Sequence, residues 1–300
     1  MIYEVLCGVS LSLGGIGFTN LSPVIPYPAL LIQHNSEKTL IIGDLHIGWE
    51  ASLAEQGVHI PSQTPVLLEQ LKKITEKTDP TRIIILGDIK HNVAKVGLTE
   101  WRDVPLFFES LLKLRREILV IPGNHDGNLE ALVPREVRIL PVSGTTIDSE
   151  VGIIHGHAWP DPSILGCNNI IMGHLHPVII LTDALGFSTA HQVWLRVNAD
   201  GEALARGLLR HVGVSVKGDA KSEMKQRFDV NSSDPRCIFI PSFNSRLAGQ
   251  IINRGIRNTR SGSQYLGPIL RSGSLNMEEG DIYLLDGSHL GRLRLLRGLT

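Results

Sequence analysis

Apolar and polar positions alternate in blocks along the first third of the chain. Residues 39–42 and 82–86 are short runs rich in β-branched side chains, a composition typical of buried strands. Between them, residues 62–76 place apolar side chains at helical intervals. The order strand, helix, strand is typical of a sheet covered by helices, so the pattern predicts an α/β fold.

The same alternation of apolar and polar blocks extends on both sides of this region. Residues 27–33 alternate and, with residues 39–42, predict a hairpin, while residues 106–114 predict a second amphipathic helix. Two polar stretches, residues 212–235 and 253–280, predict loops. Further strands are expected at residues 118–121, 152–154, 170–172, 178–182, 192–197, 237–240 and 282–285.

Length and composition bound the domain organisation. The chain has 300 residues, of which 42% are hydrophobic, enough for a sizeable buried core. No internal repeat is visible, and neither polar stretch is flanked by enough chain for a core of its own. We therefore expect a single domain over residues 1–300, with the core motifs in residues 39–180 and C-terminal strands and basic loops in residues 190–300.

The net charge, the cysteines and residues 1–19 indicate the cellular compartment. Lys and Arg number 29 against 30 Asp and Glu, so no field of the whole protein attracts nucleic acid or anionic membranes. The three cysteines, Cys7, Cys167 and Cys237, lack Cys-x-x-Cys spacing, which fits a reducing compartment. Residues 1–19 carry only Glu4 as a charge, where a secretory signal would carry Lys or Arg. We expect a cytoplasmic protein without a membrane span.

Five predicted strands end directly on side chains that bind metals. Because carboxyl ends of strands in an α/β sheet share one rim, these side chains can meet around a cation. In four of the five motifs a glycine directly before the first ligand-type residue lets the backbone turn sharply. Carboxylates and imidazoles together suit Mn, Fe, Zn or Co, and no cysteine lies in these motifs. The motifs are Asp44-x-His46, Gly87-Asp88, Gly123-Asn124-His125-Asp126, His155-Gly156-His157 and Gly173-His174-x-His176.

Each motif alone is a weak signal. A single Asp-x-His arises often by chance, a lone histidine after a strand is usually structural, and Gly87-Asp88 is ordinary turn chemistry. However, seven of the twelve histidines fall in these motifs or beside them. The combination therefore predicts a metal site. The seven are His46, His91, His125, His155, His157, His174 and His176.

In this order and spacing, the motifs over residues 44–176 resemble the signature of the calcineurin-like metallophosphoesterases. His91, the His176-Pro177 step and residues 239–244 resemble an archaeal, SbcD-related (ICC-like) phosphoesterase subgroup. The late resemblance extends through Gly267-Pro268 and residues 283–287. One departure is Ser245-Arg246, which stands where that subgroup has a Pro-Leu-like pair.

The resemblance implies a sandwich of two mixed β-sheets flanked by helices, and two divalent cations. Manganese is expected first, with Fe, Zn, Co and Ni as alternatives. Cations about 4 Å apart need a shared anionic ligand, a role that the resemblance gives to Asp88, and a bridging hydroxide can then attack phosphorus. The implied ligands are Asp44, His46, Asp88 and His176 for one cation, and Asp88, Asn124, His155 and His174 for the other.

The remaining polar residues of the motifs receive other roles. His125 is expected to face the phosphate and protonate the leaving oxygen. Asp126 either orients His125 or caps a turn, and His91 is expected to face the substrate. His157 is expected to be structural and Lys90 to be solvated. Trp49 and Glu50 are expected to be packing and helix-face residues.

The leading function is metal-dependent hydrolysis of a phosphodiester, with nucleic acid as one candidate substrate. The alternatives are a phosphomonoesterase, a phosphodiesterase for small or cyclic nucleotides, and a non-catalytic scaffold, since loops choose the substrate on a given fold. Residues 236–300 hold nine Arg and no Lys against four acidic residues. This basic segment is either a solvated surface or a phosphate-contacting rim. The sequence leaves the oligomeric state open. The arginines assigned to the rim are Arg246, Arg254, Arg257 and Arg260.

Overall fold

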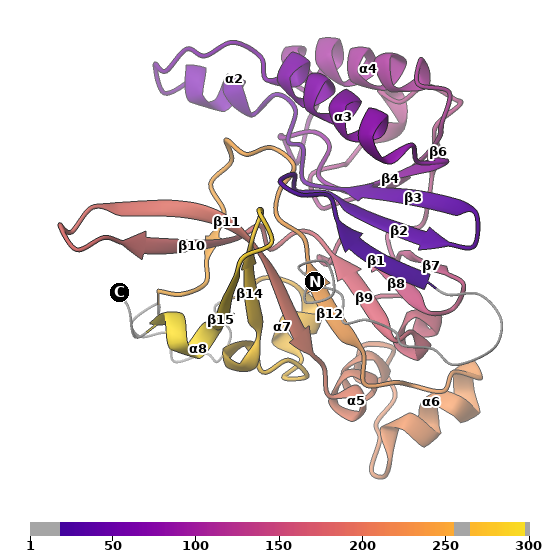
Figure 1. The fold of residues 1–300 in the computed structure, drawn as a ribbon. Coiled ribbons are helices and arrows are strands. Elements are labelled where there is room, and N and C mark those ends of the chain that lie inside the picture. Colours follow the sequence, from indigo (N-terminus) through magenta and orange to yellow (C-terminus); the bar gives the residue numbers. More distant parts are fainter. Residues whose placement is uncertain (1–18, 255–264, 298–300) are drawn as a thin grey trace. The chain divides into compact units, whose positions relative to one another are not determined.

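The computed structural model describes residues 19–254 and 265–297 (Figure 1). Backbone contacts divide the chain into two compact units. The first comprises residues 1–140 with 242–247, and the second comprises residues 141–241 with 248–300. The expectation of a single domain over residues 1–300 stays a prediction.

The first unit is built on a six-stranded sheet in the order β1-β2-β3-β4-β5-β6. The first three strands are joined by antiparallel pairings, whereas β3, β4, β5 and β6 run parallel. The sheet is therefore mixed. The strands are β1 (Thr19–Pro23), β2 (Leu30–His34), β3 (Glu37–Ile42), β4 (Arg82–Leu86), β5 (Glu117–Ile121) and β6 (Arg138–Ile139).

Two long helices pack on one face of this sheet, as Figure 1 shows: α3 (Thr64–Thr78) and α4 (Leu98–Leu112). Their apolar stripes, which include Leu71 and Phe107, share a core with alternate strand residues such as Ile85. The short helix α2 (Trp49–Ala54) follows β3, and η1 (Leu129–Ala131) follows β5. The polar motifs lie in the loops at the carboxyl ends of β3, β4 and β5, outside this packed core.

The second unit contains a mixed sheet of nine strands. Its main path runs β13-β10-β11-β12-β9-β8-β7, with β14 paired to β11 and β15 paired to β14. Strands β8, β9 and β12 are parallel neighbours, whereas β10 and β11 form a long antiparallel hairpin. The strands are β7 (Thr145–Ile147), β8 (Val151–Ile154), β9 (Asn169–Met172), β10 (Pro177–Thr182), β11 (Ser188–Asn198), β12 (Arg236–Phe239), β13 (Gln250–Ile251), β14 (Asp281–Leu284) and β15 (His289–Arg292).

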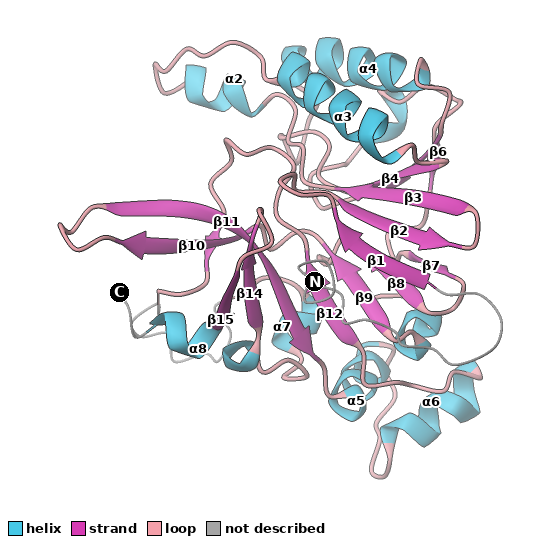
Figure 2. Ribbon diagram, viewed as in Figure 1, coloured by secondary structure: helices cyan, strands magenta, loops and turns pink. Residues whose placement is uncertain are grey.

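Helices of the second unit cover its sheet (Figure 2). Asp200 caps α5 (Gly201–His211) by accepting a hydrogen bond from the Ala203 amide at 3.0 Å, and Leu204 and Leu208 pack into the core. The other helices are η2 (Pro162–Gly166), α6 (Ala220–Phe228), α7 (Pro268–Arg271), η3 (Met277–Glu279) and α8 (Leu293–Leu296).

The predicted class, an α/β fold with two mixed sheets flanked by helices, is confirmed, and the predicted strands agree with the structure to within a few residues. Within the described residues, no helix is both long and apolar enough to cross a membrane.

Three local predictions were wrong or incomplete. The stretch 212–235, predicted to be a loop, contains α6, whose polar sequence is anchored by the buried Ala220 and Met224. The stretch 253–280 contains α7 and η3, while residues 255–264 lie outside the described part. Helix α4 begins at Leu98 and continues through Pro105, so it is longer than the predicted 106–114.

Candidate metal centre

The loops that follow β3 and β4 run side by side and are hydrogen-bonded to each other. The amide of Asp44 donates to the carbonyl of Gly87 at 3.0 Å, and the amide of His46 donates to the carbonyl of Asp88 at 2.8 Å. The amide of Ile47 continues the pattern, donating to the Ile89 carbonyl at 2.7 Å. The parallel register of the two strands is thus extended into the loops, which holds both polar motifs together.

Three predicted ligands of this unit adopt left-handed backbone conformations. The φ angles are 59° for Asp44, 45° for His46 and 50° for Asp88. Such conformations cost a non-glycine residue on the order of 1–3 kcal/mol and concentrate at functional sites. The chain therefore turns at the predicted ligands themselves, and also at Gly87, whose φ angle is 70°.

These side chains form a compact, buried group. One ligand atom from each of Asp44, His46 and Asp88 lies within 4.8 Å of the others, and Nε2 of His46 is 3.5 Å from Oδ2 of Asp88. The exposed fractions are 0%, 5% and 2%. Ligands of one cation, each about 2.0–2.2 Å from it, stand about 3 Å apart. Two carboxylates and an imidazole in this arrangement fit a divalent metal ion.

His125 lies against this group. Its amide donates to Oδ1 of Asp88 at 2.9 Å, its ring centroid is 4.6 Å from that of His46, and its Nε2 is 4.0 Å from Oδ2 of Asp88. Nδ1 of His125 contacts the carbonyl oxygen of His91. A carbonyl only accepts, so this contact assigns the Nδ1 proton and leaves Nε2 as the nitrogen that exchanges protons.

His91 completes a cluster of three imidazoles, since nitrogens of His46, His91 and His125 lie within 4.8 Å of one another. Burial, and then the neighbouring His125, lowers the pKa of His91 below its ordinary value of 6.5, against the opposing charges of Glu100 and Asp88. The neutral form of His91 is therefore favoured. Its Nδ1 is buried and has no hydrogen-bond partner within the described part of the chain.

Glu100, which the sequence reasoning missed, fixes the loop that carries His91. This fully buried carboxylate accepts hydrogen bonds from the amides of His91 at 2.9 Å, Asn92 at 2.6 Å and Gly97 at 2.6 Å. The signal in the sequence was a glycine followed three residues later by Glu, the spacing of a helix start. Glu100 thereby places the His91 carbonyl that orients His125.

Asp126 is also occupied with backbone groups. Its Oδ1 accepts from the amides of Ile89 at 2.8 Å and Lys90 at 3.3 Å, and its Oδ2 accepts from the amide of Gly123 at 2.8 Å. These bonds tie the loop after β4 to the loop after β5. Only the bond from Gly123 caps the turn, and the role of Asp126 in orienting His125 stays a prediction.

The prediction for Lys90 was wrong. Its side chain is fully buried, and Nζ donates to the carbonyls of Asn92 and, at 3.5 Å, Val93. Local backbone acceptors in the loop replace water around the charge, which the sequence pattern did not show. Glu50 is also buried and accepts a hydrogen bond from the amide of Gln63.

Residues 242–247 return to the first unit and brace the Asp44 loop. The hydroxyl of Ser242 donates to the Asp44 carbonyl at 2.8 Å, the amide of Phe243 donates to the Gly43 carbonyl at 2.9 Å, and Nδ2 of Asn244 donates to the Leu45 carbonyl at 3.0 Å. Ser242 and Asn244 are buried. The late Ser-Phe-Asn motif thus supports a ligand loop almost two hundred residues earlier in the sequence.

The second unit holds its own histidines at the ends of the parallel strands β8 and β9. Ligand nitrogens of His155 and His174 lie within 4.8 Å of each other, and the ring centroids are 5.1 Å apart. His157 stands beside them, 5.2 Å from His155 by ring centroids. His174 and His176 have φ angles of 64° and 44°, repeating the left-handed conformations of the first unit.

The predicted ligands thus fall into two groups. Asp44, His46 and Asp88 meet in the first unit, and Asn124 is exposed there at the end of β5. In the second unit His155 and His174 meet, while His176 is half-buried at the start of β10.

Comparison with known proteins gives two findings. The model of a family described as calcineurin-like phosphoesterase matches residues 37–214, more than half of the chain. Among solved structures, a nuclease of Pseudomonas putida named MPE is similar, with a TM-score of 0.48 and 15% sequence identity, over 90% of this chain and 96% of that one. Among curated proteins, none matches.

Proposed function

This chain belongs to the calcineurin-like phosphoesterase family, and from that premise we propose that it is a two-metal phosphodiesterase acting on nucleic acid. The family makes it a hydrolase of phosphate ester bonds. The observation that carries the proposal is the buried group of Asp44, His46 and Asp88, with the His125 ring against it.

The proposed ligand set is the one that the family resemblance implies. Asp44, His46, Asp88 and His176 hold one cation, and Asp88, Asn124, His155 and His174 hold the other, so that Asp88 is shared. Support comes from the short separations within each unit and from a donor set of carboxylate, amide and imidazole, which suits manganese among other divalent ions. Bound cations would polarise the phosphoryl oxygens and lower the pKa of the attacking water.

His125 supplies the proton in this proposal. As the oxygen of water bonds to phosphorus and releases a proton to the solvent, the bond from phosphorus to the leaving oxygen breaks, and Nε2 of His125 gives that oxygen a proton. The contact of Nδ1 with the His91 carbonyl holds the ring in one orientation during the transfer. The His91 ring, with its buried Nδ1, is proposed to face the substrate.

The substrate assignment rests on charge. Arg246 and Arg254 are exposed, and Arg254 donates to the hydroxyls of Thr182 at 3.3 Å and Ser188 at 3.1 Å on the β10–β11 hairpin. The other two arginines of the predicted rim, Arg257 and Arg260, lie outside the described residues. Phosphomonoesters and small cyclic diesters stay alternatives, because loops choose the substrate on this fold.

Metal analysis and a substrate panel test the proposal together. The purified chain is expected to bind close to two divalent cations, to lose activity with a chelator and to regain it with Mn. Asp88→Asn should lower activity most among the ligand variants, because it removes the shared charge. The panel compares chromogenic mono- and diesters with single-stranded and duplex DNA and RNA. Full activity of Asp88→Asn would contradict the two-metal assignment, and turnover of monoesters alone would contradict the diesterase assignment.

A further inference from the structure

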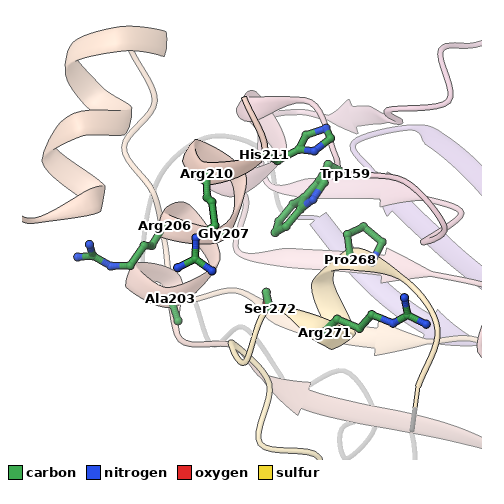
Figure 3. A pocket seen from close by; sticks show the side chains of 9 residues that line it. All are labelled: Trp159, Ala203, Arg206, Gly207, Arg210, His211, Pro268, Arg271 and Ser272. Carbon is green, nitrogen blue, oxygen red and sulfur yellow. The ribbon is translucent and has the colours of Figure 1, made fainter. Parts of the chain in front are cut away.

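A polar cleft separate from the predicted metal ligands lies within the second unit, between Trp159, α5 and α7 (Figure 3). Its volume is about 370 Å³. The α5 side contributes Arg206, Gly207 and Arg210, and the α7 side contributes Pro268 and Arg271. Three arginines and an aromatic ring therefore line the cleft, and Figure 3 draws the guanidinium groups of Arg206 and Arg271 directed away from Trp159.

The charge of this cleft is one-sided. Residues 203–217 contain two Arg, one His and one Lys but no acidic residue, and residues 266–272 add Arg271 without an acid. Within the described residues, the guanidinium of Arg210 has no hydrogen-bonded or ionic partner, and that of Arg271 uses only its Nε, which donates to the Tyr265 carbonyl at 3.2 Å. Their remaining donors are available to an anion.

Arg206 is fixed in place beside them. Its Nη2 contacts the Glu202 carboxylate and donates to the Gly218 carbonyl at 2.7 Å, and its Nη1 donates to the Val216 carbonyl at 2.8 Å. A guanidinium held at several points costs little side-chain entropy when a ligand binds. Arg206 is thus a fixed side chain whose charge Glu202 offsets, and Arg210 supplies the open donors of this side of the cleft.

Trp159 provides a flat apolar surface in the same cleft. Its ring stacks on His211 with centroids 5.9 Å apart and planes 26° from parallel. A Cβ added to Gly207 would lie 2.6 Å from the Trp159 ring, so glycine here lets the indole lie against α5. Figure 3 shows the indole directed between the α5 and α7 residues. Aromatic rings beside arginines are the usual platform for nucleobases next to phosphates.

The cleft adjoins the histidine loops of its own unit. Trp159 follows His155 by four residues, and α7 begins after Gly267. A Cβ on Gly267 would lie 2.5 Å from the Gly156 carbonyl and 3.7 Å from the His174 ring. The residues that wall the cleft are thus continuous with those that flank two predicted metal ligands.

A neighbouring cleft shares two of the arginines. Arg206 and Arg210 also line a cavity of about 330 Å³ formed with residues 213–216. Placement in the last turn of α5 explains why positive charge is favourable at Arg210, through the helix dipole. It does not account for the aromatic ring or for two cavities that meet at the same guanidinium groups.

We propose that the Trp159 cleft binds a nucleotide unit, with its phosphate on Arg210 and its base stacked on Trp159. The ligand is a nucleotide within single-stranded nucleic acid or a free mononucleotide, which share this chemistry. The adjacent cavity favours the strand, because a second unit has a place on the same arginines. The inference rests on the proposed function for the identity of the strand as substrate, but binding can be measured without hydrolysis.

The test is equilibrium binding of a fluorescent phosphorothioate octamer of thymidylate, which resists hydrolysis, to the full chain with Mn. Trp159→Ala should weaken binding about 5- to 100-fold, the effect of losing one stacked base. Arg210→Gln with Arg271→Gln should reduce the slope of log affinity against log salt by about 0.7, since one phosphate contact in a single strand contributes about 0.7. Trp101→Ala and the pair Arg135→Gln with Arg138→Gln, all exposed residues of the first unit, are matched controls.

Two further measurements separate the outcomes. Thymidine monophosphate that competes as well as the octamer would identify a mononucleotide site, whereas much weaker competition would identify a strand. Equal binding by wild type and cleft variants, or no binding by wild type, would overturn the inference. Hydrolysis of a chromogenic diester reports the metal centre independently and should be unchanged in the arginine variants. If the wild type binds the octamer but hydrolyses no ester, the proposed function is refuted while the inference on the Trp159 cleft stands.

Discussion

A Cβ placed on Gly123 would lie 2.1 Å from Oδ1 of Asp88 and 2.4 Å from its amide nitrogen. Gly123 follows β5, and Asp88 follows the neighbouring parallel strand β4. The first position of the Gly-Asn-His-Asp motif is thus glycine because the Asp88 carboxylate occupies the space of its side chain. The two motifs constrain each other through contact across adjacent strands.

Gly123→Ala is therefore expected to displace Asp88 and lower activity by about 10²-fold, the cost of misplacing a catalytic group by about 1 Å. Metal content should fall in the same variant, because Asp88 is the proposed shared ligand. Gly218→Ala is the control, since a Cβ there meets no atom within 4 Å. Elemental analysis and the rate on a chromogenic diester check both variants. Normal metal content and rate in Gly123→Ala would show that the Asp88 loop relaxes without consequence.

Asp126→Asn is expected to lower the free energy of unfolding by about 1.5–3 kcal/mol, the range for hydrogen bonds to a charged group. The physical reason is that the buried carboxylate accepts from three backbone amides, and an amide group would present a donor to one of them. Denaturant unfolding measures the effect. Asp79→Asn, at an exposed pair with Arg116, should change stability by less than about 1 kcal/mol. A stable Asp126→Asn variant with altered leaving-group dependence would instead favour an orienting role towards His125.

The two described cysteines should be unreactive in the folded protein. Burial raises the pKa of the Cys237 thiol to about 12, and burial with the charge of Glu150 raises that of Cys167 to about 11. The thiolate is the nucleophile, so both should resist a disulfide reagent at pH 8 in a Cys7→Ser background and react after denaturation. Rapid labelling of the native variant would show that these sites open.

The same thiols make stability depend on alkaline pH. The folded state holds each proton more tightly than the unfolded state, where the ordinary pKa is 9.0, so the stabilisation is complete below pH 9. It is lost as pH rises from 9 towards the folded values, by about 1.4 kcal/mol for each thiol between pH 8 and 10. Cys237→Ala should show a loss smaller by that amount in denaturant titrations. An equal loss would indicate that other groups cause the dependence.

Most of the fold could be predicted from the sequence, because the periodicity of apolar residues indicates which side chains are buried. The run 82–86 coincides with β4, since continuous β-branched residues fit a strand covered on both faces. Helix α6 was missed because only Ala220 and Met224 are buried there, and two apolar contacts leave little periodicity in the sequence. The helix is started instead by Asp219, which accepts from the Ser222 amide at 2.8 Å.

The motifs that carry the predicted ligands could be recognised in the sequence, whereas the residues that support their loops could not. Asp44 and Asp88 were predicted to meet because parallel strands end at one edge. Their loops do run side by side in the first unit, and their role as metal ligands stays a prediction. The roles of Glu100 and the burial of Lys90 depend on how the loop of residues 88–97 folds over itself, and no pattern encodes that path. Acidic and basic residues without periodicity are read as solvated by default, so buried ones are missed.

The last prediction concerns His125, whose removal distinguishes a role in proton transfer from a role as a metal ligand. His125→Ala should keep the metal content of the wild type, because the ring is not among the proposed ligands. It should lose about 10² to 10⁴ in rate on alkyl or nucleotide diesters, whose leaving oxygens need a proton. The loss should be smaller with a nitrophenolate leaving group, which departs as a stable anion.

His91→Ala is the matched variant, because it removes a neighbouring ring but keeps the backbone carbonyl that contacts Nδ1 of His125. Its rate can fall through weaker substrate binding, yet its dependence on the leaving group should follow the wild type. Rates on both ester types and elemental analysis check the pair. Loss of metal in His125→Ala would make this histidine a ligand or a structural residue. Equal loss on both leaving groups would mean that it stabilises charge without transferring a proton, since only proton transfer distinguishes the two leaving oxygens.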